Sequence, residues 1–207
     1  MWGTSDRLNR ILLGKIPSMH LINRRHLLAG LGSSLAFPAH AEEPAMSLVS
    51  AYTFSFPAIN GGTIRLSDFR GKPVLVVNTA SQCGFTGQFA GLQRLWTRFN
   101  PLGLAIIGVP SNDFGGQEPG DAEDIMATAE GEYHIEFPMA AKTRVTGPDA
   151  HPFYRWTASL RPRETPRWNF HKYLIDRNGQ LAEVFPTSTD PTDSRIISAL
   201  IKVTGAA

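Results

Sequence analysis

The feature that most constrains the fold is a pair of apolar runs with one helical segment between them. The first run extends over Val74–Val77 in "GKPVLVVNTA", and the second, "LGLAIIGVP", is closed by Pro110. Residues 87–100 separate the two runs and carry large apolar side chains at helical spacing. Strands without polar alternation are buried on both faces of a sheet, and two strands joined by a helix run parallel. The sequence therefore predicts an α/β protein built on two buried parallel strands.

The flanking segments extend this core into a mixed sheet. Alternating aromatic residues over 52–56 and a turn at Asn60–Gly62 predict an N-terminal β-hairpin. The later segments are predicted as a helix at 120–133, a strand at 137–145, a helix at 151–160, a hairpin at 173–185 and a closing helix at 191–203. Asp121 and Asp190 are expected to cap the first and last of these helices. A mixed central β-sheet with helices on both faces is the thioredoxin-like arrangement.

The first 41 residues have the layout of an export leader. Paired arginines at 24–25 precede an apolar run over 27–37, which ends in the small-residue motif "AHA". Paired arginines before a short apolar run resemble a twin-arginine export signal. We therefore expect residues 1–41 to be a leader, with Met19 as an alternative start, and residues 42–207 to be a periplasmic domain. Cytoplasmic location and retention by a signal anchor are the alternatives.

The charge balance argues against a protein that binds nucleic acid. The chain carries +2 at pH 7, but residues 1–41 hold five of its 20 Lys and Arg residues and one of its 18 Asp and Glu residues. Residues 42–207 therefore have a net charge of −2. No long cationic stripe remains there to contact phosphate groups, so nucleic acid is not an expected partner.

Cys83 is the only cysteine in the chain, so an internal disulfide is excluded. It stands where the first buried strand ends and a helix is about to begin. In α/β proteins the crevice beyond the carboxyl ends of the strands is the usual functional site, and a helix N-terminus favours a thiolate. Cys83 is therefore a candidate nucleophile. A buried inert thiol and a metal ligand are the alternatives, but the three histidines of residues 42–207 show no ligand spacing, so no metal site is predicted.

Three other side chains could stabilise such a thiolate. Gln117 lies in the glycine-rich stretch "GVPSNDFGGQEPG", and Trp168 and Asn169 directly precede the last predicted hairpin. Amide and indole N–H groups donate hydrogen bonds without readily giving up a proton that would neutralise sulfur. Taken singly, each residue also has an ordinary explanation: loop surface for Gln117, a core aromatic for Trp168 and a turn for Asn169.

Taken together, these motifs resemble those of the glutathione peroxidase family. The resemblance covers residues 48–205 and rests on "GKPVLVVNTASQCGFTGQFAGLQ", "IIGVPSNDFGGQEPG" and "WNFHKYLIDRNGQ", in that order. It implies a thioredoxin fold and a catalytic tetrad of Cys83, Gln117, Trp168 and Asn169. It also implies a peroxidase that needs no bound cofactor, in which Cys83 becomes a sulfenic acid and external thiols restore it.

Departures from the family pattern bear on how the enzyme would be reduced. Many members with an active-site cysteine have a second, resolving cysteine, and Ala129 stands near its place here. Where members often have "PCN", this chain has Pro110–Asn112 with serine in the middle. Both reducing equivalents must then come from glutathione or a thioredoxin-like protein. The stretch 160–168 is shorter than in tetrameric members, which implies a monomer.

Three arginines precede Trp168 in the sequence. Arg161, Arg163 and Arg167 could bind the carboxylates of glutathione or a lipid headgroup. A solvated loop with screened charges is the alternative interpretation.

A single thiol on this fold is also compatible with other functions. A thiol–disulfide oxidoreductase normally needs C-x-x-C, and Thr86 stands at the place of the second cysteine of that motif. A copper-binding module needs a second soft ligand, which the sequence does not offer. A peroxide sensor would share the chemistry of Cys83 and pass its oxidation to a partner protein. We expect an antioxidant peroxidase whose partners are hydroperoxides and thiols.

Overall fold

The computed structural model describes residues 49–205, so the predicted leader at 1–41 lies outside the described residues. The strands are β1 (Ser55–Pro57), β2 (Thr63–Arg65), β3 (Val74–Thr79), β4 (Ala105–Pro110), β5 (Lys172–Ile175) and β6 (Leu181–Phe185). The α-helices are α1 (Gln88–Phe99), α2 (Ala122–Met126), α3 (Pro152–Leu160) and α4 (Ser194–Thr204). Short helical segments are η1 (Ala51–Thr53), η2 (Leu66–Phe69), η3 (Asn100–Leu102) and η4 (Ala127–Glu132). Within the described range, no helix has the length and apolar character to cross a bilayer.

The central sheet is mixed, as the sequence predicts. Its strand order is β4-β3-β5-β6, with β3 and β4 parallel and β5 antiparallel to both of its neighbours. Val76 of β3 pairs with Ile107 on one side and with Tyr173 on the other. Strands β1 and β2 form a separate antiparallel hairpin, which is the predicted N-terminal one. All six residues of β3 are buried, which explains its continuous apolar run.

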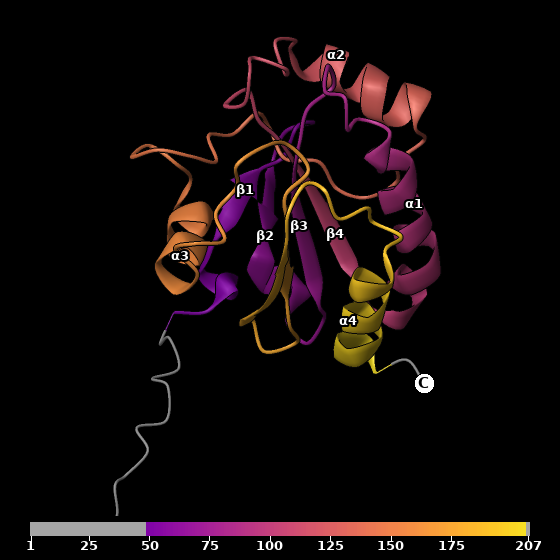
Figure 1. The fold of residues 1–207 in the computed structure, drawn as a ribbon, viewed down its shortest axis with the longest axis vertical. Helices are drawn as coiled ribbons and strands as arrows, with labels where there is room; N and C mark the ends of the chain where they lie inside the picture. Colours follow the sequence, from indigo (N-terminus) through magenta and orange to yellow (C-terminus); the bar gives the residue numbers. More distant parts are fainter. Residues whose placement is uncertain (1–48, 206–207) are drawn as a thin grey trace, which may run out of the picture. The chain divides into compact units, whose positions relative to one another are not determined.

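Helices cover both faces of this sheet (Figure 1). On one face, Leu75 and Val77 of β3 pack in a core with residues of α1 and α4. On the other face, Val74 and Val76 pack in a second core with Phe153 and other residues of α3. Because successive side chains of a strand point to opposite faces, β3 supplies both cores. The described residues therefore form a thioredoxin-like α/β fold, and the predicted fold class is confirmed.

The predicted strand at 137–145 is wrong. Only two isolated bridges form there, Met139 with Gly108 and Ala140 with Ala58. The segment runs beside β4, and the N–H groups of Ala140 and Thr143 bond to it, but Pro138 and Pro110 of β4 have no N–H to donate. A regular ladder therefore cannot develop, although the segment is extended.

Two predicted helix boundaries also change. Asp121 caps α2 in a reciprocal box with Asp124, as expected, but the α-helix ends at Met126 and continues as the π-helical η4. The closing helix begins at Ser194 and is capped by Asp193, whose side chain accepts the N–H of Arg195. Asp190 instead accepts the N–H of Thr192 at 2.8 Å, which makes a separate turn before the helix. The Asp-Pro pair is thus a turn signal here.

Candidate active site

Cys83 lies in a tight turn between β3 and α1. The residue is 8% exposed, and its sulfur accepts the N–H of Phe85 at 3.4 Å. The hydroxyl oxygen of Thr86 accepts the N–H of Cys83 at 3.1 Å and lies 2.7 Å from the Cys83 carbonyl oxygen, to which it can donate. An N–H directed at sulfur stabilises a thiolate more than a thiol. These bonds fix the backbone of the Cys83 turn, which directly precedes helix α1 and its first residue, Gln88.

The loop that carries Gln117 is bonded to the Cys83 turn at two points. The N–H of Gln82 donates to the carbonyl oxygen of Gln117 at 2.9 Å. The N–H of Ser81 donates to the carboxylate of Glu118 at 3.1 Å. Glu118 is 1% exposed, and this burial raises its pKa. Both bonds place the Gln117 loop directly against the residues that precede Cys83.

Trp168 and Asn169 are positioned by Asn78, a completely buried residue of β3. The Asn78 amide donates to the carbonyl oxygen of Trp168 at 3.1 Å, and its oxygen accepts the N–H of His171 at 3.1 Å. Asn169 is also completely buried, and its amide donates to the side-chain oxygen of Gln117 at 3.0 Å. Because this bond uses the oxygen of Gln117, the Gln117 NH₂ group stays free to donate elsewhere. The structure thus brings two predicted site residues into direct contact.

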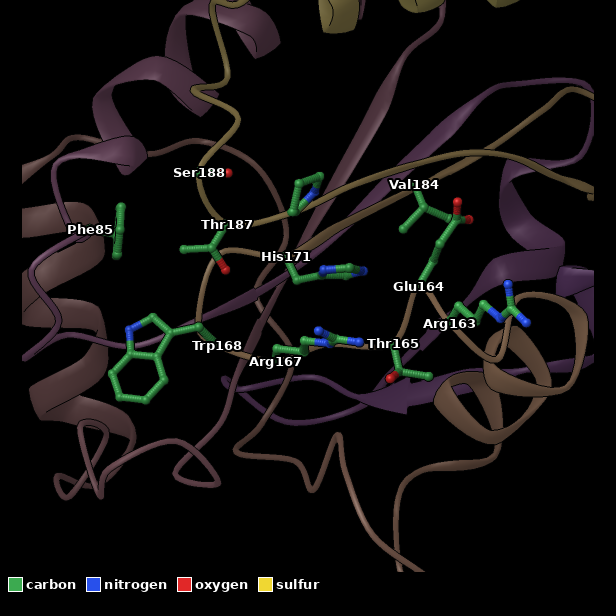
Figure 2. Close-up of a pocket in the computed structure, with 11 residues that line it drawn as sticks. Phe85, Arg163, Glu164, Thr165, Arg167, Trp168, His171, Val184, Thr187 and Ser188 are labelled. Carbon is green, nitrogen blue, oxygen red and sulfur yellow. The ribbon is translucent and has the colours of Figure 1, made fainter.

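Trp168 borders a cavity of about 610 Å³ beside the Cys83 turn. Trp168 is 38% exposed, and Phe85, which lies two residues after Cys83, is 40% exposed. Figure 2 shows Trp168 and Phe85 at one end of this cavity, with Arg163 and Val184 at the opposite end. The cavity therefore includes Phe85, whose N–H bonds to the Cys83 sulfur, and extends from there toward Arg163 and Val184.

Only two of the three predicted arginines line the cavity. Arg163 and Arg167 line the cavity, whereas Arg161 is not among its lining residues. Arg161 pairs instead with Glu164 at 3.0 Å, with both side chains more than 40% exposed. Such exposed pairs contribute little to stability. The positive charge of the cavity wall therefore comes from the other two arginines.

Two buried basic residues lie next to the cavity on the β5 side. His171 is 5% exposed and lines the cavity. Burial and the neighbouring Lys172 lower the pKa of His171 to about 4, so its imidazole is neutral at pH 7. Lys172 is completely buried, and this burial lowers its pKa to about 7, with Asp190 acting in the opposite direction.

The protein therefore belongs to the class of thioredoxin-like proteins that have a single thiol at a strand–helix junction. Thr86 occupies the position of the second thiol in a C-x-x-C oxidoreductase and holds the Cys83 turn closed. Over the range 49–205, no three His, Cys, Asp or Glu side chains gather closely enough to hold a metal ion.

Comparison with known proteins then gives the family. The sequence model of the glutathione peroxidase family matches residues 51–158. A hydroperoxy fatty acid reductase, gpx1, of Synechocystis is 40% identical over 151 residues, covering 69% of this chain and 89% of that protein. A glutathione peroxidase of Lactococcus lactis is 43% identical over 145 residues, covering 69% and 92%. The chain belongs to the glutathione peroxidase family and is a peroxidase.

Solved structures give the same result for the fold. The crystal structure of Trgpx in its apo form is 33% identical, has a TM-score of 0.60, and covers 74% of this chain and 97% of that one. The crystal structure of T. cruzi GPX1 is 28% identical, also with a TM-score of 0.60, and covers 76% and 97%. A secreted Mycobacterium tuberculosis disulfide oxidoreductase shares the fold alone, at 12% identity and a TM-score of 0.52.

Sequence reasoning missed the residues that hold this site together. These residues are Asn78, Glu118 and Lys172, each 1% exposed or less. They form hydrogen bonds with Trp168, with Ser81 and with Phe170, respectively. For Asn78 and Lys172 the available signal was a polar residue within or next to an apolar run, because most buried polar groups are hydrogen-bonded. Glu118, in the polar stretch "GGQEPG", had no such signal. That signal does not name the partners, which are distant in sequence.

Proposed function

We propose that the protein reduces hydroperoxides through a thiolate at Cys83. The sulfur attacks one oxygen of the peroxide, the O–O bond breaks, and the sulfur becomes a sulfenic acid. The peroxide receives the two electrons that the sulfur loses, and the leaving alkoxide or hydroxide takes a proton from water. Gln117, Trp168 and Asn169 donate hydrogen bonds that stabilise the developing negative charge. The main support for this proposal is the hydrogen bond between the side chains of Asn169 and Gln117. The loop that contains Gln117 is itself bonded to the Cys83 turn.

We also propose that two external thiol groups restore Cys83. A first thiol condenses with the sulfenic acid, releasing water and leaving a mixed disulfide, and a second thiol then frees Cys83. Cys83 is the only cysteine in the chain, and Ala129, near the place of a resolving cysteine, is completely buried within η4. Two glutathione molecules or one dithiol protein of the thioredoxin type would supply the electrons.

The cavity supports organic hydroperoxides as substrates beside hydrogen peroxide. Phe85, Trp168 and Val184 give it apolar walls, and Arg163 and Arg167 offer positive charge for a carboxylate. One relative, from Synechocystis, is named as a reductase of hydroperoxy fatty acids. A fatty-acid hydroperoxide combines the two chemistries that this cavity presents, and its removal would serve defence against oxidative stress.

The deciding experiment follows oxidation of the reduced protein by hydrogen peroxide in a stopped-flow instrument, with Cys83→Ser beside it. The wild type should lose peroxide rapidly and gain one oxygen on Cys83, detected by mass spectrometry, and the variant should do neither. Equal and slow peroxide loss by both proteins would refute the proposal. Insulin reduction in the absence of peroxide would favour the thiol–disulfide oxidoreductase instead.

We further propose that residues 1–41 direct export and that the mature domain, 42–207, acts as a monomer in the periplasm. The support is the paired arginines at 24–25 followed by the apolar run over 27–37. Cell fractionation of the full chain should place the shortened protein in the periplasm, and replacing both arginines with lysine should keep the uncleaved chain in the cytoplasm. A periplasmic fraction that is unaffected by the double substitution would contradict the twin-arginine assignment.

A further inference from the structure

Lys172 makes an unusual set of contacts for a completely buried lysine. Its ammonium group donates to the side-chain oxygen of Gln88 at 2.7 Å, to the carbonyl oxygen of Phe170 at 2.7 Å and to the carbonyl oxygen of Thr189 at 2.8 Å. Within residues 49–205 it has no salt-bridge partner. An ammonium group has three N–H bonds, and each of them has one acceptor here. Lys172 therefore joins three separate segments at one point.

One of these segments is a wall of the cavity. Pro186, Thr187 and Ser188 line the cavity and, with Thr189, form what we call the 186–189 wall. Gln88, the first residue of α1, donates from its amide to the carbonyl oxygen of Thr187 at 2.8 Å. Within residues 49–205, the hydrogen bonds that join this wall to the rest of the protein come from Gln88 and Lys172. Gln88 also accepts from Lys172, so the two side chains form one buried clamp.

In the described part of the chain, the clamp touches the Trp168 side of the cavity only through the carbonyl oxygen of Phe170. Trp168 is held through its carbonyl oxygen by Asn78, and Asn169 is held by Gln117. Removing the ammonium group would therefore release the 186–189 wall, while the residues proposed to act on the peroxide keep their own anchors. In the proposed function, hydrogen peroxide is too small to need the wall, whereas the organic part of a large hydroperoxide would lie against it.

We propose that Lys172, with Gln88, is a positioning residue that sets the specificity of the enzyme for hydroperoxides with a large organic group. Lys172 touches neither the thiol nor the substrate in this scheme. It acts through the backbone of the 186–189 wall, which it holds at a fixed place in the cavity lining that also includes Phe85 and Trp168. The inference rests on the proposed function, in which hydroperoxides reach Cys83 from the cavity.

The test compares Lys172→Met with Lys72→Met, which removes an exposed lysine outside the cavity. The rate constant for oxidation of Cys83 is measured with hydrogen peroxide and with linoleic acid hydroperoxide, and thermal unfolding is followed in parallel. Lys172→Met should lower the rate constant for the fatty-acid hydroperoxide at least tenfold and that for hydrogen peroxide less than threefold. Lys72→Met should change neither. Gln88→Leu, which breaks part of the clamp, should shift the ratio in the same direction by a smaller factor.

Three results would overturn the inference. The first is a lower melting temperature of Lys172→Met with both rate constants unchanged, which would make the lysine only structural. The second is an equal loss with both peroxides, which would place its effect at the thiol. The third, should Lys172→Met not fold, is an unchanged ratio in Gln88→Leu. If the wild type itself leaves Cys83 unoxidised, the proposed function fails instead, so the two failures are distinguishable.

Discussion

At the scale of single residues, the site depends on buried amides more than on charges. Asn78 and Asn169 are both completely buried, and their side chains bond to Trp168, His171 and Gln117. A neutral amide can be buried at low cost once it is hydrogen-bonded, whereas a buried charge needs a partner. Amide donors also stay unchanged across the whole pH range in which a thiolate exists.

Replacement of Asn169 with alanine tests this arrangement. The substitution leaves the Gln117 oxygen without its donor and removes one N–H from the site, so we expect oxidation of Cys83 to slow about tenfold, or about 1.4 kcal/mol in the barrier. Stability should fall by about 1–2 kcal/mol, because a buried hydrogen bond is lost. Stopped-flow oxidation and urea unfolding measure the two effects. Asn178→Ala, in an exposed turn, is the matched control and should change neither the oxidation rate nor the stability. An oxidation rate in Asn169→Ala equal to that of the wild type would show that Asn169 is not part of the site.

His171 gives a prediction for stability as a function of pH. Its pKa is lowered from 6.5 to about 4 in the folded protein, mainly by burial. Between those two values the unfolded chain binds more protons than the folded one, so stability is full above pH 6.5 and falls as the pH drops toward 4. The loss due to His171 should reach roughly 3 kcal/mol.

The measurement is urea unfolding at pH 7.5 and pH 4.5 for the wild type and His171→Phe. The phenylalanine keeps an aromatic ring against Tyr173, whose ring centre lies 4.8 Å from that of His171, but it does not titrate. The wild type should lose more stability than the variant between the two pH values. Parallel losses in both proteins would show that His171 is not the titrating group.

At the scale of elements, the turn from β3 to α1 is closed by one hydroxyl group. Thr86→Val keeps the shape of the side chain but leaves the N–H of Cys83 without its acceptor. We expect a loss of about 1–3 kcal/mol in stability and a slower oxidation of Cys83, since the turn that presents the thiol loosens. Chemical unfolding and stopped-flow oxidation are compared with Thr63→Val on the exposed side of β2. Unchanged values for Thr86→Val would mean that the backbone alone holds the turn.

The clamp between α1 and the 186–189 wall should respond to pH. Its lysine has a pKa of about 7, and deprotonation leaves two N–H groups for three acceptors. The charged groups around Lys172 are Asp190, which favours the ammonium form, and Arg94, which acts on Asp190, while His171 is neutral above pH 5. The ratio of the rate constants for fatty-acid hydroperoxide and hydrogen peroxide should therefore fall as the pH rises from 6 to 8.5.

A ratio is the useful quantity because ionisation of Cys83 affects both rate constants equally. In Lys172→Met the ratio should be low and independent of pH. A ratio that falls equally in the variant would assign the pH dependence to another group.

The sequence could predict the elements and the site residues to different degrees. Fully buried strands such as β3 and β4 are recognisable because every position is apolar, and Asp121 marks a helix start because its side chain caps locally. The segment 137–145 misled the prediction because its composition suits a strand while Pro138 denies it a ladder. The partners of Lys172 lie up to 84 residues away, and no local pattern encodes contacts of that range.

At the scale of the whole molecule, the single thiol sets the stoichiometry that we expect of the proposed reaction. Peroxide without added thiol should give one oxygen on Cys83 and no internal disulfide, and added glutathione should give a mixed disulfide in a 1:1 ratio. Intact-protein mass spectrometry under non-reducing conditions checks both products. Cys83→Ser is the control and should gain neither. A disulfide-linked dimer as the main product would indicate that a second copy of the chain serves as the resolving partner.

Cys83 is the only cysteine in the chain, and a buried alanine, Ala129 of η4, stands near the place of a resolving cysteine. In the proposed mechanism no second cysteine of the same chain could trap the sulfenic acid, so its survival would depend on how soon a free thiol arrives. Where thiols are abundant, each molecule would turn over many times. Where they are scarce, a second peroxide would reach the sulfur first and drive it to the irreversible sulfinic state. The same fold would then work as a catalyst in one compartment and as a single-use scavenger in another.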